Sequence, residues 1–435
     1  MYLFGSDVAY ACDSGPEWFR AMIDGVPPAG KAKVRVAWQR SIAELADVAS
    51  ADGLVGVNCT GWTDKALAAA GFAHVSRFAV LPNIEKARWF VPLESPALSA
   101  AGLAVHTPAR KSSLLKHMAL RLATRMRLPI WYRDTVCVAH RQTPPLQGLL
   151  ARLFPGVKLH LALTSGAPEP AKNRKTSVAV LDGKGELCAF LKVAGSPLSR
   201  RLLEHEANVL QAIGNDTSKA RRAPRLLFAG EVEGRYITVQ TPLHGKPVLA
   251  DLSDSHLAFL ESLHANEQKI ASETALVAGL LPRLESLEMP RPELVAMLEQ
   301  AMPVLEALTV PSTIVHGDFV PWNLRRQGSA ISAFDWEYAQ IDGLPLMDQT
   351  HFIIQHRYEL SSGSPQEAYR DLCGFAASGP MGFSAELVRA IQLIYLIDHL
   401  ARLFGEKYDE NEHMVSWYRK LLDCYPAPVA EAVCA

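Results

Sequence analysis

Short apolar runs separated by turn-forming residues mark the middle of the chain. Residues 176–181 (TSVAVL) and 186–193 (ELCAFLKV) are apolar and partly β-branched, and the four residues DGKG at 182–185 stand between them. Two such runs around a glycine-containing turn are typical of a β-hairpin. A further run at 235–241 (RYITVQT) predicts another strand.

The pattern changes to a helical one in three later stretches. Leucine recurs there at helical spacing, with valine in the first stretch and with isoleucine and tyrosine in the last, which places these side chains on one face of an α-helix. The stretches are residues 200–210, 251–264 and 386–422. A strand-rich segment followed by a helix-rich segment predicts the α+β fold class.

The first 155 residues form their own pattern. Residues 51–57 and 74–81 read as strands, and residues 64–70 read as a short helix that stops at Gly71. The chain of 435 residues is also longer than one compact domain usually needs. We therefore expect a separate small α/β domain at 1–155, a strand-rich lobe at 156–244 and a helical lobe at 245–435.

A basic amphipathic helix is expected at residues 110–127 (RKSSLLKHMALRLATRMR). Leucine and methionine recur at helical spacing, and arginine and lysine supply the charge. One interpretation is that the apolar face packs inside its own domain. The other is that the helix lies on an anionic membrane or against an acidic protein partner.

The composition and net charge limit the classes of protein to which this chain can belong. The chain is 49% hydrophobic with a net charge of −1, which gives no overall attraction to nucleic acid. Seven cysteines are scattered without C-x-x-C spacing, and no signal peptide opens the chain. Reduced thiols in a cytoplasmic protein without a zinc site are the simplest interpretation.

The candidate chemistry lies in residues 315–337. Asp318, Asn323 and Asp335 each follow or interrupt a short apolar run within eighteen positions. Phosphoryl transfer from a nucleoside triphosphate needs one carboxylate to orient the attacking hydroxyl, and an amide oxygen with a second carboxylate to hold magnesium. Asp318 suits the first role as the catalytic residue, and Asn323 and Asp335 suit the second as metal ligands.

The sequence H-G-D-x-x-P-x-N at 316–323, followed by F-D-W-E at 334–337, resembles the aminoglycoside phosphotransferase / choline kinase family. This resemblance implies a protein-kinase-like bilobal fold, with an antiparallel β small lobe and an α-helical large lobe. It also implies ATP and Mg²⁺ as cofactors. The implied partner is a small molecule with a hydroxyl group, such as a sugar, an amino sugar or an amino alcohol.

The same resemblance assigns nucleotide-binding residues upstream. Lys192 corresponds to the lysine that holds the α- and β-phosphates, and Glu206, or failing that Glu204, corresponds to its glutamate partner. Gln240 and Leu243 lie in the implied linker that meets the adenine. The alternative is that both glutamates lie on a solvated helix face without a binding role.

One segment departs from the family. Residues 164–175, which should cover the phosphates, contain one glycine and no G-x-G-x-x-G. Ser165 and the basic residues that follow are candidate donors to phosphate, and a solvated loop is the alternative. The departure keeps open a second hypothesis, a catalytically weak or inactive pseudokinase that binds a nucleotide or a partner.

The order of elements in the N-terminal region faintly resembles the C-terminal half of a class I methyltransferase fold. Residues 1–155 contain no glycine-rich loop able to bind S-adenosylmethionine. A scaffolding or partner-binding role is therefore the prediction for this region.

Overall fold

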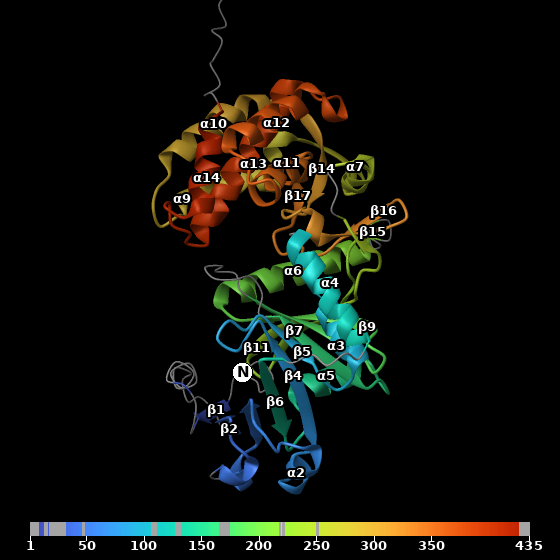
Figure 1. Ribbon diagram of the computed structural model, residues 1–435. Helices are drawn as coiled ribbons and strands as arrows, with labels where there is room; N and C mark the ends of the chain where they lie inside the picture. Colours follow the sequence, from blue (N-terminus) through green and yellow to red (C-terminus); the bar gives the residue numbers. More distant parts are fainter. Residues whose placement is uncertain are drawn as a thin grey trace, which may run out of the picture. The chain divides into compact units, whose positions relative to one another are not determined.

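The computed structural model describes residues 8–12, 16, 32–45, 48–105, 111–126, 132–164, 175–216, 219, 222–248 and 252–425. It consists of two compact units. The first comprises Met1–Glu204 with Leu226–Pro242, and the second comprises His205–Arg225 with Leu243–Ala435. Figure 1 labels the helices and strands of both units.

In the described part of the first unit, eleven strands form one sheet in the order β1-β2-β3-β6-β4-β5-β7-β8-β9-β11-β10. Neighbours β1, β2 and β3 are parallel, and the pairs from β3 onward are antiparallel. The strands are β1 (Val8–Cys12), β2 (Ala32–Trp38), β3 (Gly53–Val57), β4 (His74–Leu81), β5 (Trp89–Pro92), β6 (Asp134–His140), β7 (Leu159–Thr164), β8 (Lys175–Asp182), β9 (Leu187–Ala194), β10 (Leu226–Val232) and β11 (Arg235–Gln240).

The predicted hairpin is present as β8 and β9. Asp182 holds its turn, because one carboxylate oxygen accepts the backbone N–H groups of Lys184 and Glu186 at 2.8 Å each. Gly185 takes a φ of +85°, a conformation that glycine adopts without steric cost. Local turn chemistry therefore fixes the register of the two strands that the apolar runs predicted.

The separate N-terminal domain that we expected is not confirmed. Strand β5 pairs with β7 through Phe90 opposite Leu163, and β7 pairs with β8 along its length. If β7 were an edge strand, the backbone donors and acceptors along its free side would be exposed. In the structure β5 pairs with that side of β7. Residues before 156 thus continue the sheet of the expected small lobe, and the likeness to a methyltransferase is not confirmed either.

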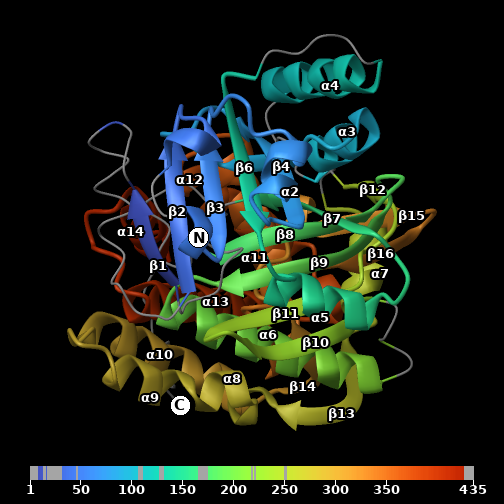
Figure 2. The ribbon, with the colours of Figure 1, turned by 90° about the horizontal axis from the view of Figure 1, so that it is seen from below.

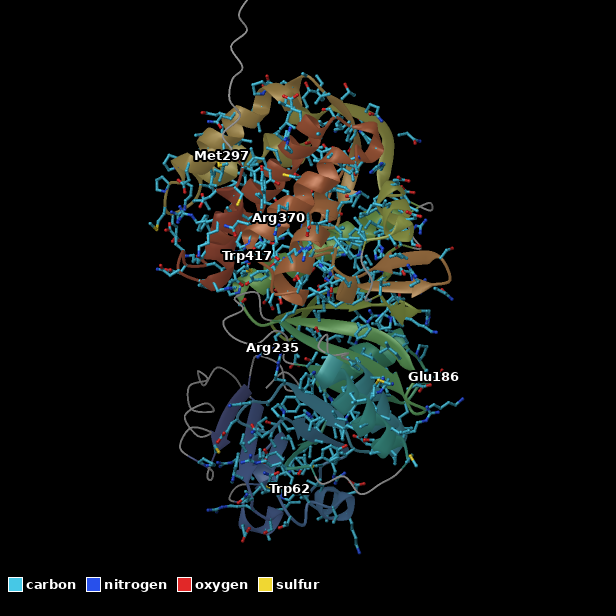
Figure 3. All side chains as sticks on the ribbon, turned by 45° about the horizontal axis from the view of Figure 1, so that its top comes forward. Trp62, Glu186, Arg235, Met297, Arg370 and Trp417 are labelled. Carbon is cyan, nitrogen blue, oxygen red and sulfur yellow. The ribbon has the colours of Figure 1, made fainter. Side chains whose placement is uncertain are left out.

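The helices described in this unit are α2 (Asp64–Ala69), α3 (Pro96–Ala104), α4 (Lys111–Arg125), α5 (Pro145–Leu153) and α6 (Pro197–Asn215), the last of which continues into the second unit. Valine and leucine side chains of the strands pack with α5 in the main apolar cluster. A smaller cluster forms around Trp62, which is labelled in Figure 3. The ring of Trp62 lies over Gly56. A Cβ at Gly56 would approach that ring to 2.7 Å, so this position needs a glycine.

The second unit is mainly helical (Figure 2). Its helices are α7 (Asp254–Glu261), α8 (Ala275–Ala278), α9 (Leu280–Glu285), α10 (Pro292–Glu306), α11 (Met347–Gln355), α12 (Pro365–Ala377), α13 (Ala385–Gly405) and α14 (His413–Leu422). Two small sheets accompany them, built from β12 (Lys246–Pro247), β13 (His264–Ile270), β14 (Thr309–Val315), β15 (Leu324–Gln327), β16 (Ala330–Ala333) and β17 (Gln340–Gly343). The chain is thus α+β, with an antiparallel sheet and a helical part, as the sequence predicted.

The core of this unit lies among α10 to α14. Helix α13 is buried along most of its length, because apolar residues occur on nearly all sides of it. None of the helices in the described ranges combines the length and the apolarity that crossing a bilayer requires.

Candidate active site

The loop that carries the predicted chemistry leaves β14 at His316 and ends in a short 3₁₀ turn at Pro321–Asn323. Gly317 opens the loop with a φ of +78°, and a Cβ there would lie 2.2 Å from the carbonyl oxygen of Tyr338. Only glycine fits both the backbone conformation and this close approach. The loop is therefore pressed against residues 338–339, downstream of Asp335.

Asp348, at the start of α11, holds the other side of the loop. Its two carboxylate oxygens accept the backbone N–H groups of His316 at 2.7 Å and Gly317 at 2.9 Å. Burial raises the pKa of Asp348 to about 7, and the two donors act in the opposite direction. These contacts give Asp348 a structural role, because they fix the backbone at the start of the loop.

His316 is buried and braces the loop from within. Its Nδ1 accepts the backbone N–H of Asp318 at 3.2 Å, so Nε2 carries the proton and donates to the carbonyl oxygen of Phe334 at 3.1 Å. Burial lowers its pKa to about 4, which keeps the ring neutral. The ring also lies 4.4 Å from that of Trp336, so His316 joins the loop to the F-D-W-E segment.

The three residues that the sequence selected for catalysis and metal binding come together within the second unit. The amide nitrogen of Asn323 donates to Asp318 twice, to its carbonyl oxygen at 3.0 Å and to its Oδ2 at 2.8 Å. The N–H of Phe334, next to Asp335, donates to the carbonyl oxygen of Asn323 at 3.0 Å. The charge of Asp335 is close enough to oppose ionisation of Asp318.

Asp335 itself has a φ of +72°. Aspartate is one of the few non-glycine residues that tolerate this left-handed conformation, which still costs some energy. Residues held in such conformations concentrate at functional sites. Asp335 is one of eight non-glycine residues with a positive φ in the described part of the chain, and its conformation agrees with the role that the motif suggested.

His351 is a site residue that sequence reasoning missed. Its Nε2 lies 3.1 Å from Oδ1 of Asp318, and its Nδ1 lies 2.7 Å from the hydroxyl of Tyr395. An ionised carboxylate only accepts hydrogen bonds, so Nε2 carries the proton and Nδ1 accepts from Tyr395. Burial lowers the pKa of His351, in keeping with a neutral ring. The only sequence signal is its position three residues after Asp348 on α11.

The hydrogen bonds continue behind His351. Burial holds the pKa of Tyr395 well above its ordinary value, so this hydroxyl stays protonated and donates. The hydroxyl of Tyr418 lies 3.4 Å from that of Tyr395, and it accepts from the side-chain amide of Gln355 at 3.0 Å. A directed chain of donors therefore runs from α14 through α13 to His351 and ends on Asp318.

This chain of hydrogen bonds determines the protonation state of Asp318. Burial is the largest single effect and would raise the pKa of Asp318, but the hydrogen bond from His351 and the electrostatic interactions with His351 and His316 together outweigh it, and the pKa is lowered. The carboxylate is therefore ionised at neutral pH. With Asn323 bound to Oδ2 and His351 to Oδ1, it is held on both sides by donors.

A cavity of about 200 Å³ lies beside these hydrogen-bonded side chains in the second unit, and Gly317 and His351 are among its lining residues. Arg402 donates to the carbonyl oxygen of Gly317 at 3.3 Å and stacks 4.0 Å over the ring of Tyr338. The other charged lining residues include Glu337, Asp348 and the ion pair of Arg283 with Asp398. Charged side chains thus line part of this cavity, beside apolar ones such as Leu276, Val315 and Met347.

The two candidate glutamates, Glu206 and Glu204, lie in different environments. Glu206 is fully buried, and its carboxylate accepts the backbone N–H of Trp336 at 3.1 Å. Glu204 instead makes a surface ion pair with Arg200 at 2.9 Å, and its side chain is 40% exposed. Glu206 therefore contacts the segment that contains Asp335.

The remaining predicted residues belong to the first unit, to the second unit or to the part of the chain outside the described residues. Lys192 lies in β9 of the first unit, between Ser177 of β8 and Thr238 of β11, and is 8% exposed. Gln240 ends β11 and is buried, whereas Leu243 is the first residue of the second segment of the second unit and is half-buried. Ser165 lies outside the described residues.

Magnesium is the metal that the predicted donor set would bind. Across the parts of the chain with described positions, no group of three or more His, Cys, Asp or Glu side chains could hold a metal ion. The predicted set needs no such group, because Mg²⁺ is usually bound by one or two carboxylates with phosphates and waters. The side-chain nitrogen of Asn323 points toward Asp318, so the side-chain oxygen of Asn323 points away from Asp318.

Comparisons with known proteins give one family. Residues 165–371 match the sequence model described as the phosphotransferase enzyme family. A search of curated protein sequences finds no match.

Several solved structures are similar to parts of the chain. A thermostable mutant of aminoglycoside phosphotransferase APH(4)-Ia, in ternary complex with ADP and hygromycin B, is 16% identical, with a TM-score of 0.42 over 64% of this chain and 96% of that one. Ethanolamine kinase from Plasmodium vivax is 13% identical, with a TM-score of 0.42 over 62% and 82% of the two chains.

Proposed function

Because residues 165–371 match the sequence model of the phosphotransferase enzyme family, we propose that the protein transfers the terminal phosphate of ATP to a hydroxyl group of a small molecule. The observation that carries the proposal is the set formed by Asp318, Asn323 and Asp335. Asp318 and Asn323 are bonded at 2.8 Å, and the residue before Asp335 is bonded to Asn323 at 3.0 Å.

Asp318 acts on the acceptor. Its lowered pKa leaves it ionised at neutral pH, so it accepts a hydrogen bond from the attacking hydroxyl and orients that oxygen toward the phosphorus. The donors on both of its oxygens restrict its rotation. Holding the reacting groups in place supplies much of the rate in this class of reaction.

Asn323 and Asp335 would hold Mg²⁺, with the amide oxygen of Asn323 and the carboxylate of Asp335 as ligands. When bound, the metal supplies positive charge that neutralises the phosphate oxygens. The contact of Glu206 with the N–H of Trp336 supports the backbone next to Asp335. The roles of Lys192, Gln240, Leu243 and Ser165 toward the nucleotide stay predictions from the resemblance.

The cavity beside His351 supports a small and polar acceptor. Its volume of about 200 Å³ is below the roughly 300–1,000 Å³ of pockets that take drug-sized ligands. Carboxylates and arginines in its lining favour a compound with several hydroxyl or amino groups. An amino alcohol or a monosaccharide fits these properties better than a large oligosaccharide.

The proposal is tested by measuring ADP release with Mg-ATP and a panel of choline, homoserine, monosaccharides and aminoglycosides. The wild-type protein is compared with Asp318→Asn and with a control, Asp423→Asn, which changes an exposed aspartate of the same unit. We expect acceptor-dependent ADP release that Asp318→Asn abolishes and Asp423→Asn retains. Acceptor-dependent release that survives in Asp318→Asn would refute the assignment.

The pseudokinase hypothesis predicts a different result in the same samples. A ligand that binds the native state raises the melting temperature. No stabilisation by Mg-ATP, together with no ADP release for any acceptor, would replace the proposed function by a binding role without nucleotide chemistry.

A further inference from the structure

Helix α4 exposes its most apolar face. Leu115, Met118, Leu122 and Met126 follow one another at spacings of three and four residues and are 71%, 56%, 58% and 61% exposed. We name these four residues the α4 stripe. Large apolar side chains are normally buried, and a contiguous exposed group of them marks an interaction surface.

The same helix is anchored through its opposite face. Leu120 packs with Leu103 and its neighbours, and Thr124 is 6% exposed. Helices α3 and α4 lie side by side in the first unit (Figure 2). The interpretation that the main apolar face of this segment packs inside its own domain is therefore wrong. The helix packs through the less apolar face that carries Leu120 and Thr124, and the α4 stripe is exposed.

A groove of about 450 Å³ lies alongside the α4 stripe. Its lining combines apolar and cationic side chains: Ala97, Ala101, Met118, Leu122, Arg121 and Arg125. Lys184, from the turn between β8 and β9, adds a third cation, and none of the described lining residues is acidic. An apolar floor with a cationic rim matches a ligand that has an anionic head and an apolar body.

The charge of the surrounding sequence agrees with such a ligand. Between Glu94 and Asp134 the chain has no aspartate or glutamate, and it has seven lysines and arginines: Arg110, Lys111, Lys116, Arg121, Arg125, Arg127 and Arg133. An acidic surface attracts such a segment at a distance, and each lysine or arginine near an anionic membrane adds to the attraction.

We propose that the α4 stripe and the groove beside it dock the protein onto an anionic phospholipid surface. Leu115, Met118, Leu122 and Met126 enter the boundary between headgroups and acyl chains, and Arg121, Arg125 and Lys184 contact lipid phosphates. Amphipathic helices with an apolar face and flanking arginines bind membranes in this way, lying in the interface without crossing it. This inference does not depend on the proposed function.

The test is sedimentation of the full chain with vesicles of phosphatidylcholine that contain about 30% phosphatidylserine, beside vesicles of phosphatidylcholine alone. Two double variants are compared, Met118→Gln with Leu122→Gln, and Arg121→Gln with Arg125→Gln. Met289→Gln is the matched control, since Met289 is 62% exposed and lies in the second unit. All changed side chains are exposed, so the melting temperatures should stay close to that of the wild type.

We expect the wild type and Met289→Gln to bind the anionic vesicles, and the binding to weaken in high salt. Each double variant should lower the partition coefficient about tenfold or more. Absence of binding, or equal binding by all variants, would overturn the proposal. Self-association that the double variants abolish, measured by light scattering without lipid, would also overturn it in favour of a second copy of the chain.

Discussion

The Nε2–H of His351 is hydrogen-bonded to Oδ1 of Asp318 at 3.1 Å, although the two residues are 33 positions apart. Asp318 lies in the loop after β14, and His351 lies on α11. The same helix begins with Asp348, which holds the loop by its backbone. One helix therefore positions both the backbone and the side chain of the proposed catalytic residue.

Replacing His351 tests this positioning role. His351→Phe keeps a ring but removes the N–H, so we expect kcat to fall about 10- to 100-fold while the KM for ATP changes little. The pKa of Asp318 should rise, because the hydrogen bond that lowers it is lost. The acidic limb of the rate profile should then move to higher pH.

The control for this change is His351→Gln, whose amide can donate to Asp318 in place of the imidazole. It should recover part of kcat and return the acidic limb toward its wild-type position. Equal losses in both variants, with an unmoved pH profile, would indicate that His351 only fills space.

Asp335→Asn is expected to abolish magnesium-dependent nucleotide binding, because one of two proposed metal ligands loses its charge. Calorimetry with ATP in the presence and absence of Mg²⁺ measures this directly. The variant should bind ATP equally with and without the metal. Full retention of the magnesium effect would remove Asp335 from the metal site.

Gly317→Ala should destabilise the fold by about 3 kcal/mol, since it combines an unfavourable backbone conformation with a backbone clash. The clash is with the carbonyl oxygen of Tyr338, only 2.2 Å from the added Cβ. Urea unfolding without ligand measures the effect. Gly374→Ala in α12 is the control, because a Cβ there meets no atom within 4 Å and alanine favours the helix by about 0.5–1 kcal/mol.

Asp348 gives a pH-dependent prediction. Its pKa of about 7 in the folded protein exceeds the value of about 3.9 in an unfolded chain. The folded state therefore holds this proton more tightly, and the stability it contributes is complete below about pH 4 and is lost as pH rises through about 7.

Urea unfolding of the wild type and Asp348→Asn at about pH 5 and about pH 8 separates this contribution from those of other groups. The free energy of unfolding of the wild type, relative to that of the variant, should fall between the two pH values. A relative rise would mean that the two backbone donors, and not burial, decide the state of Asp348.

Local signals explain which parts of the fold the sequence predicted. The DGKG turn defined the β8–β9 hairpin, and the H-G-D-x-x-P-x-N motif located Asp318 and Asn323 on one loop. The pairing of β5 with β7 left no such signal, because strands pair through backbone groups that are the same in any sequence. The sequence therefore suggested a separate domain where the structure has a continuous sheet.

Long-range contacts explain the other differences. The predicted helix at 251–264 ends at Glu261, because His264 pairs with Thr313 of β14 and takes the following residues into a strand. His351 likewise acquires its role only when α11 packs beside the loop. The exposed α4 stripe has the same spacing as a buried one, so periodicity alone does not tell which face of that helix packs.

Single-turnover phosphate transfer by Asp318→Asn tests the central claim most directly. The variant is loaded with Mg-ATP and mixed with an acceptor that the wild type phosphorylates. We predict that it binds Mg-ATP with wild-type affinity but transfers phosphate about 10²- to 10⁴-fold more slowly. Transfer at the wild-type rate would show that Asp318 does not act on the acceptor hydroxyl.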